Sequence, residues 1–217
     1  MKWNDHHELE GLHAFLGASQ FHWINWQEED VVARYFGSFS QARGTALHEL
    51  ACDCVRSKTV LNENDIPLIK LTMYKAYIPE QAYDAQLLLD TLMPFVNDGI
   101  RDGMSTEVLL YYSPFCFGTA DQIRFFENEK VLKIKDLKSG RTKTHMEQLE
   151  IYAALFCLEY GYDPNDITIE LSIYQRGEVF IFNPQPYEIS TIMDLIKSRD
   201  ALIQQALGKG VTTQYGQ

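Results

Sequence analysis

Long hydrophobic runs are missing from this sequence of 217 residues. No apolar stretch approaches the roughly 18 to 20 residues of a membrane-spanning helix, and the polar first residues do not resemble a signal peptide. Low-complexity stretches, internal repeats and long linkers rich in Pro or Gly are missing too. We therefore expect one domain, residues 1–217, that does not contact a membrane and resides in the cytoplasm.

Paired cysteine motifs are also missing. The four cysteines are Cys52, Cys54, Cys116 and Cys157, and they lack the Cys-x2-Cys spacing of a structural zinc site. A disulfide framework is not needed inside the cell, so we expect reduced thiols that are mostly buried. The sequence has no G-x-x-x-x-G-K-[ST] phosphate-binding loop, and we expect no ATP-driven motor in this chain.

Positive charge is scarce. The formal net charge is −11, which argues against a protein that binds nucleic acid over its whole surface. Residues 130–143 depart from this balance, because they contain six basic residues and one acid, Asp136. Such a run is usually a solvated face, but it also fits a small cleft with local positive charge. The basic residues are Lys130, Lys133, Lys135, Lys138, Arg141 and Lys143.

Periodicity predicts helices first and a sheet afterwards. The first 60 residues look helical, and apolar residues recur at helical spacing from Gln41 to Lys58. Pro79 suits the first turn of a helix that continues through Leu92 and Val96. Beyond this helix we expect strands at 106–112, 117–126, 131–138, 168–175 and 178–182, a loop at 163–166, and helices at about 144–160 and 188–207. This order predicts an α/β fold: a mixed central β-sheet flanked by helices, with a helical N-terminal part over about 1–103 and the sheet over about 104–217.

The strand expected at 131–138 carries two charged residues on an apolar face. The strand period of two places Asp136 and Lys138 on the same side as two preceding apolar residues. Since an isolated buried charge is costly, this acid and this base must pair or coordinate something. They also lie at the end of the strand, where sheets open to solvent and sites are commonly built. The alternative is a frayed strand end with solvated charges.

A second acid, Asp121, follows the small residues Gly118, Thr119 and Ala120 in the preceding strand. Adjacent antiparallel strands can bring Asp121 beside Asp136, with Cβ atoms about 5 Å apart. Two carboxylates at that distance repel each other unless a cation lies between them, and such oxygen ligands suit Mg²⁺ or Mn²⁺. We expect a divalent metal site that activates water and stabilises a charged phosphate, with Lys138 adding positive charge.

Asp121 followed by Asp136-Leu137-Lys138 at a strand end resembles the PD-(D/E)XK nuclease superfamily. Two further motifs resemble those of its RecB-like and phage-exonuclease branch. Gly44-Thr-Ala-Leu-His48 is similar to G-x-x-x-H, and Gln148-Leu-Glu-Ile-Tyr152 is similar to Q-x-x-x-Y. The four motifs occur in the family order over roughly residues 13 to 183. The expected elements also match the restriction-endonuclease-like αβββαβ core of that superfamily, here with a helical N-terminal elaboration.

The resemblance implies a metal-dependent deoxyribonuclease that hydrolyses DNA phosphodiester bonds. It further implies that His48, Asp121, Asp136 and the Leu137 carbonyl hold the metal. Asp121, Asp136 and Lys138 would form the catalytic group, with Lys138 positioning the water or stabilising the transition state. Gln148 and Tyr152, one helical turn apart, would contact DNA or buttress Lys138. Glu107 on the first strand is a candidate supporting acid.

The resemblance to phage-encoded members of this superfamily suggests an exonuclease for recombination, replication or repair, in a bacterial or phage-infected cell. They also suggest a homo-oligomer that encloses DNA and a recombination or replication partner protein. Two features depart from the family pattern. Ala120 replaces the proline before the first acid, and no cysteine follows Cys157, unlike in the iron–sulfur relatives. We therefore expect no iron–sulfur cluster.

Two other functions fit parts of the sequence. A catalytically inactive relative would keep the fold and bind DNA or a protein, although such a module has little use for clustered acids facing phosphate. A metalloenzyme acting on a small phosphorylated substrate would need a closed pocket instead of an open groove.

Overall fold

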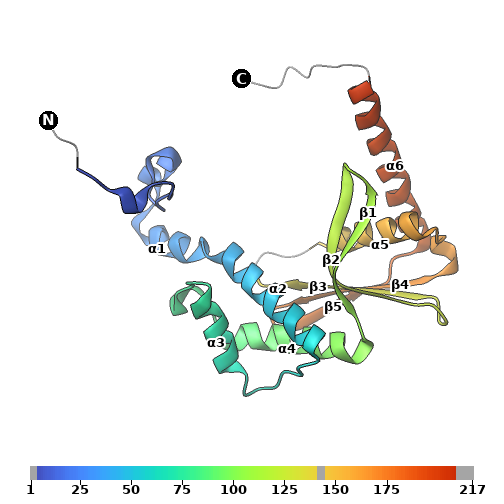
Figure 1. Ribbon diagram of the computed structural model, residues 1–217, viewed down its shortest axis with the longest axis horizontal. Coiled ribbons are helices and arrows are strands. Elements are labelled where there is room, and N and C mark those ends of the chain that lie inside the picture. Colours follow the sequence, from blue (N-terminus) through green and yellow to red (C-terminus); the bar gives the residue numbers. More distant parts are fainter. Residues whose placement is uncertain (1–3, 141–144, 209–217) are drawn as a thin grey trace.

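Helices form most of residues 18–102, and a sheet with two further α-helices forms most of residues 105–208 (Figure 1). The computed structural model describes residues 4–140 and 145–208. The elements in chain order are η1 (His7–Leu9), η2 (Ala18–Asn25), α1 (Glu28–Gly37), α2 (Ser40–Ser57), α3 (Ile66–Lys75), η3 (Glu80–Ala82), α4 (Ala85–Asp102), β1 (Ser105–Ser113), β2 (Cys116–Phe126), β3 (Val131–Lys138), α5 (Glu147–Tyr160), η4 (Pro164–Asp166), β4 (Thr168–Gln175), β5 (Glu178–Phe182) and α6 (Pro186–Gly208).

The five strands form one mixed sheet in the order β1-β2-β3-β4-β5. β1, β2 and β3 are antiparallel neighbours, β3 and β4 are parallel, and β5 returns antiparallel to β4. A parallel pair needs a long crossover, and α5 lies in the connection between β3 and β4. The structure confirms the expected α/β class with a mixed sheet flanked by helices, and each strand lies within one residue of its predicted bounds.

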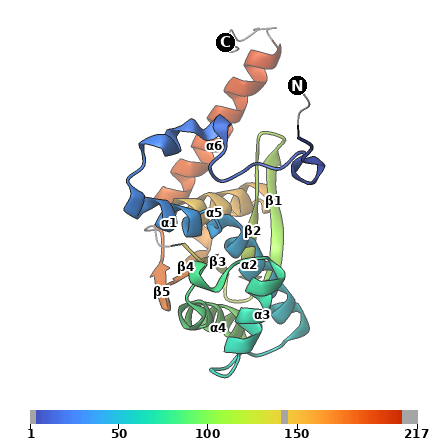
Figure 2. The same ribbon diagram turned by 90° about the vertical axis from the view of Figure 1, so that its left-hand side faces the viewer.

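Helices cover both faces of this sheet (Figures 1 and 2). One hydrophobic core lies between the sheet and α2, α3 and α4, and it includes Leu137 and Tyr174. The other lies beneath α5 and α6 and includes Leu132 and Ile134. Successive residues of β3 therefore enter different cores, and each fully buried Leu or Ile contributes about 1.5–3 kcal/mol to stability. A side chain at the end of β3 is held by packing on both faces.

The start of α4 differs from the sequence prediction. Pro79 was expected in the first turn of this helix, but it precedes the one-turn η3, and α4 begins only after Asp84. The Asp84 side chain accepts a hydrogen bond from the Leu87 backbone N–H at 3.1 Å. This carboxylate satisfies a free N–H group at the helix start, so Asp84 takes the N-cap position and the prediction for Pro79 is wrong.

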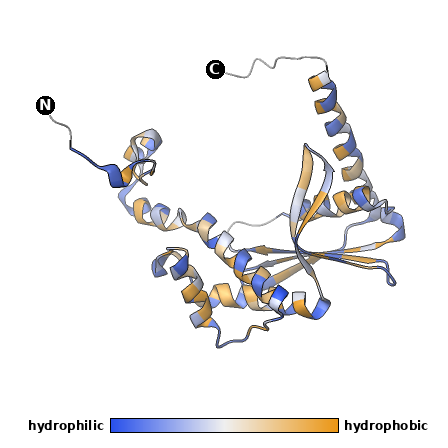
Figure 3. Ribbon diagram, in the orientation of Figure 1, coloured by the Kyte–Doolittle hydropathy of each residue, from blue (hydrophilic) through white to orange (hydrophobic). Residues whose placement is uncertain are grey.

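The N-terminal part is less helical than expected. Residues 4–27 contain only η1 and η2, and none of the described side chains in 4–39 is buried. Phe15 contacts the rings of Trp26 and Tyr35, at centroid distances of 5.6 and 5.3 Å. Apolar and polar residues mix along this segment and along α6 (Figure 3). Within the described ranges, the helices are all too short or too polar to span a bilayer.

The cysteines are free thiols in the described part of the chain, as expected. Cys52, Cys54 and Cys157 are buried and Cys116 is half-buried. Burial raises the pKa of Cys157 to about 12. A thiol with so high a pKa forms almost no thiolate at neutral pH and is chemically inert.

Candidate metal and catalytic centre

Asp121 and Asp136 meet where β2 and β3 separate. The last paired residues of the two strands are Gln122 and Lys135, so the next pair in this register would be Asp121 and Asp136. The ladder stops there, and the Leu137 backbone N–H donates to Asp121 Oδ2 at 2.9 Å. A side chain thus replaces the strand neighbour as hydrogen-bond partner. The structure brings together the two acids that the sequence placed on adjacent strands.

Asp136 is a buried carboxylate with only 2% of its surface exposed. Burial and the repulsion of Asp121 raise its pKa to about 6, although the ammonium of Lys138 acts in the opposite direction. Lys138 Nζ lies 3.0 Å from Oδ1 and 2.9 Å from Oδ2. Oδ2 nevertheless receives no well-oriented hydrogen bond from the described residues. An acid in this state has capacity for a further cationic partner.

His48 reaches the same place from α2. Its Nε2 donates to the Leu137 carbonyl at 2.8 Å, and its Nδ1 lies 3.3 Å from Asp121 Oδ1. Burial alone would lower the His48 pKa, but the hydrogen bond and charge of Asp121, together with Asp136 and the Leu137 carbonyl, raise it above the usual value. A protonated imidazole can donate to both oxygens. Its positive charge then lies between the groups expected to hold a metal.

Glu107 joins this centre from β1. One ligand atom each of His48, Glu107 and Asp121 lie within 4.8 Å of one another, a spacing that suits one metal ion. The backbone of Glu107 has φ 54°, a left-handed conformation that is uncommon for a non-glycine residue and recurs at functional sites. Asp136 lies outside this group of three, and its carboxylate contacts Lys138. Glu107 is therefore as well placed as a ligand as the two expected acids.

Lys138 begins a chain of polar contacts that leads to α5. Its Nζ donates to Gln148 Oε1 at 3.0 Å, and Gln148 Nε2 donates to the Tyr152 hydroxyl at 2.9 Å. Gln148 and Tyr152 are one helical turn apart and share a face of α5. Of the two roles that the sequence left open, Gln148 has the geometry to buttress Lys138.

Gly118, on β2, leaves room for the side chain of Tyr152 from α5. A Cβ atom at Gly118 would lie 2.8 Å from Tyr152 Cε1, closer than a real Cβ contact. Among the small residues before Asp121, Gly118 therefore leaves space that the ring of Tyr152 occupies.

A cleft of about 580 Å³ adjoins the three candidate ligands. One face of α2 lines it, and that face continues past His48 through Glu49, Cys52, Asp53 and Arg56. Of these residues, only Cys52 was named from the sequence, as one of the buried thiols. Their recurrence every three or four residues along α2 was the available signal, because residues at that spacing share a helical face.

The basic stretch 130–143 does not surround the cleft as a group. Lys135 is buried on the α4 side of β3, and Lys133 pairs with Glu170 at 3.1 Å. Lys130 lies over the ring of Tyr162. Among the described members only Lys138 reaches the centre, because the strand period sends Lys133 and Lys135 to the opposite face. Arg141 and Lys143 lie outside the described residues.

Comparisons of the chain with protein-family models, with curated proteins and with solved structures gave no match. Its function is therefore inferred from the chemistry of this centre.

Proposed function

We propose that this protein is a metal-dependent deoxyribonuclease with a restriction-endonuclease-like core. The proposal extends to a phage-type exonuclease acting in recombination, replication or repair. The observation that carries it is the convergence of His48, Glu107, Asp121, Asp136 and Lys138 beside α2, at the point where β2 and β3 separate. The element order α4-β1-β2-β3-α5-β4 agrees with an αβββαβ core.

The residues at the centre fit a divalent cation. Carboxylate oxygens and one imidazole nitrogen are ligands that Mn²⁺ accepts, and an oxygen-rich set suits Mg²⁺. Asp136 adds a buried carboxylate whose pKa is raised to about 6 in the absence of an ion, so a cation nearby would favour its charged form. A bound Mg²⁺ or Mn²⁺ would supply positive charge for a phosphate and lower the pKa of a coordinated water.

Among the described residues, Lys138 hydrogen-bonds to two partners, which leaves one donor for the reaction. A lysine ammonium carries three hydrogens, and the Lys138 ammonium contacts Asp136 and Gln148. The third hydrogen is available to orient water or to stabilise a phosphate oxygen as its negative charge grows. Asp136 and Gln148 fix the ammonium from two sides, so its direction is set before a substrate binds. Asp136 thereby orients Lys138 in addition to its expected role as a ligand.

Access to the centre favours a polymer over a small phosphorylated substrate. The Glu107 side chain is exposed, and the side chain of Lys138 is 29% exposed. A phosphodiester that lies across the point where β2 and β3 separate can reach both groups, whereas a small-substrate enzyme generally encloses its ligand. This accessibility supports DNA as the substrate.

Incubation with end-labelled linear, circular and single-stranded DNA in Mg²⁺ or Mn²⁺ tests the proposal. We expect degradation of linear DNA and no degradation in EDTA, and circular DNA should resist if the enzyme is an exonuclease. DNA binding without degradation in either metal would instead support the catalytically inactive alternative. If the protein neither binds nor degrades any of the three DNA forms, both the nuclease proposal and the catalytically inactive alternative are wrong.

A further inference from the structure

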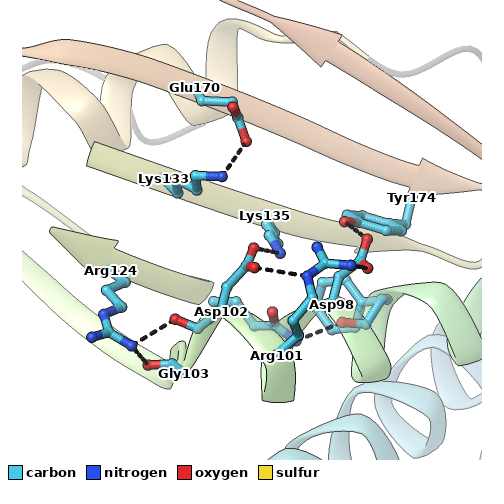
Figure 4. Close-up of polar contacts among 11 residues, drawn as sticks. Asp98, Arg101, Asp102, Gly103, Arg124, Lys133, Lys135, Glu170 and Tyr174 are labelled. Carbon is cyan, nitrogen blue, oxygen red and sulfur yellow. Dashed lines mark hydrogen bonds and ion pairs between the residues drawn. The ribbon is translucent and has the colours of Figure 1, made fainter. Parts of the chain in front are cut away.

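The side of β3 that faces away from the candidate centre carries a network of charged and hydroxyl groups, of which Lys135 and Tyr174 are buried (Figure 4). Lys135 precedes Asp136 on β3 and is only 3% exposed, and its Nζ donates to Asp102 Oδ2 at 2.7 Å. Asp102 is the last residue of α4. Because side chains alternate along a strand, this ion pair anchors β3 directly behind Asp136.

A second anchor lies on the neighbouring strand. Tyr174 of β4 is the ladder partner of Leu137, and it is 2% exposed. Its hydroxyl donates to Asp98 Oδ2 at 2.8 Å, one turn before Asp102 on α4. Its ring packs edge-on against Phe95 at a centroid distance of 5.3 Å. The residue pair that presents the Leu137 carbonyl is thus attached to the same helix.

Two arginines hold the α4 acceptors in place. Arg101 contacts Asp98 at 2.5 Å and Asp102 at 3.1 Å, and therefore links the two anchors (Figure 4). Arg124 of β2 donates to the backbone carbonyls of Asp102 and Gly103, at 2.6 and 3.1 Å. The end of α4 is consequently attached to β2, β3 and β4, the strands that carry or pair with Asp121, Asp136 and Leu137.

Stability alone does not account for this arrangement. Burying a lysine and an aspartate costs desolvation, and apolar residues of similar volume often stabilise a fold equally well. An ion pair and a hydroxyl hydrogen bond, unlike apolar packing, fix the direction and the distance between two elements. Groups that orient ligands from outside the coordination sphere affect metal affinity through such constraints.

We propose that Lys135 and Tyr174 are positioning residues that hold Asp136 and the Leu137 carbonyl in the geometry required by a divalent cation. The proposal rests on the proposed function, because it assumes that the ion binds at this centre. Neither residue touches the ion or the DNA. Their effect passes through the backbone of β3 and β4, which α4 supports from behind.

Two single substitutions and one matched control test the proposal in the full chain. Lys135→Met removes the ammonium and keeps most of the stem, and Tyr174→Phe removes only the hydroxyl. Lys133→Met is the control, because Lys133 lies on the same side of β3, also forms an ion pair, and is one strand repeat farther from Asp136. Calorimetric titration with Mn²⁺ gives metal affinity without DNA, and thermal unfolding gives stability.

We expect Lys135→Met and Tyr174→Phe each to weaken Mn²⁺ affinity roughly tenfold. Both should lower kcat on DNA and leave KM nearly unchanged, whereas Lys133→Met should bind Mn²⁺ like the wild type. If Asp102→Asn is added to Lys135→Met, metal affinity should fall little further, because both changes remove the same contact. Should Lys135→Met fail to fold, Tyr174→Phe alone decides the question.

Mn²⁺ affinity within twofold of the wild type in both variants would overturn the proposal and leave the network a purely structural role. That outcome is distinct from failure of the proposed function. If the wild type binds Mn²⁺ and Asp136→Asn loses it, the metal centre stands whatever the network variants show. If the wild type binds no Mn²⁺, both proposals are wrong.

Discussion

At the scale of one residue, Asp136 shows a conflict between stability and function, because the buried carboxylate that would serve the metal site opposes folding when it is charged. The folded protein holds this carboxyl in a buried position beside Asp121, where its pKa is raised to about 6 from an ordinary 3.8. The metal-free fold therefore binds a proton that the unfolded chain releases as the pH rises above about 4. Once the pH exceeds 6, this stabilising contribution is lost and the charged carboxylate opposes folding.

Because the charged carboxylate opposes folding, we predict that Asp136→Asn stabilises the metal-free protein at pH 8. The free energy of unfolding should rise by up to about 3 kcal/mol at pH 8 and by less at pH 5, where the wild-type carboxyl is itself protonated. Urea unfolding in EDTA at both pH values measures this free energy. Asp194→Asn on α6 is the control, because that side chain is 82% exposed and should change stability little. A variant less stable than the wild type at pH 8 would contradict the electrostatic account.

The position of His48 leads us to predict that metal binding displaces a proton from its imidazole. The pKa of His48 is raised, and its imidazole contacts Asp121 and the Leu137 carbonyl where a metal would lie. We expect more protons to be released per Mn²⁺ bound at pH 6.5 than at pH 8.5, because a raised pKa leaves more of the imidazole protonated at the lower pH. Calorimetry in buffers of different ionisation enthalpy counts these protons, and His48→Gln should release fewer. A binding heat independent of the buffer at pH 6.5 would argue against His48 as a ligand.

At the scale of elements, the centre depends on how closely α5 approaches β2. Tyr152 fits against Gly118, and through Gln148 it supports the ammonium of Lys138. The position of one helix thus determines where the catalytic ammonium points.

Gly118→Ala should disturb this approach. The added methyl group would lie 2.8 Å from the Tyr152 ring, so the ring and Gln148 must shift. We expect kcat on DNA to fall at least roughly tenfold, because small displacements near a catalytic group are costly. Gly37→Ala on α1 is the control, since a Cβ there meets no atom within 4 Å. The loss should be smaller in a Tyr152→Ala background, and an equal loss there would show that the ring is not involved.

The limits of sequence-based prediction also follow from the elements. The strands were predictable because their β-branched and aromatic residues lie between clear turn signals. The start of α4 was not, because Pro79 and Asp84 both suit a helix start and only tertiary packing decides between them. The opposite faces of β3 followed from its period, but Asp102, the partner of Lys135, lies 33 residues away and left no local signal. Glu107 remained open for the same reason.

At the scale of the whole molecule, the acidic balance constrains how DNA can bind. The net charge is −11, and the described cleft lining contains four acids but one arginine, Arg56. Phosphate contacts provide most of the affinity of nucleic-acid binding, so a metal-free cleft of this kind should repel DNA. A divalent cation at the centre would reverse the local sign of charge.

We therefore predict that DNA binding requires a divalent cation. Fluorescence anisotropy with a labelled duplex should show at least roughly tenfold tighter binding in Ca²⁺ than in EDTA at equal ionic strength. Asp121→Asn should reduce this difference, because it removes one candidate ligand. Equal affinity in EDTA and in Ca²⁺ would place the main DNA contacts away from the centre.

The central claim is that a divalent ion held around Asp121 and Asp136 allows this protein to cleave DNA. Its most direct measurement is nucleotide release from end-labelled linear duplex, after the protein has been stripped with EDTA and Mn²⁺ has been added back. We predict no release before the addition, release by the wild type after it, and none by Asp136→Ala at any Mn²⁺ concentration. Cleavage in EDTA, or equal cleavage by Asp136→Ala, would contradict the account.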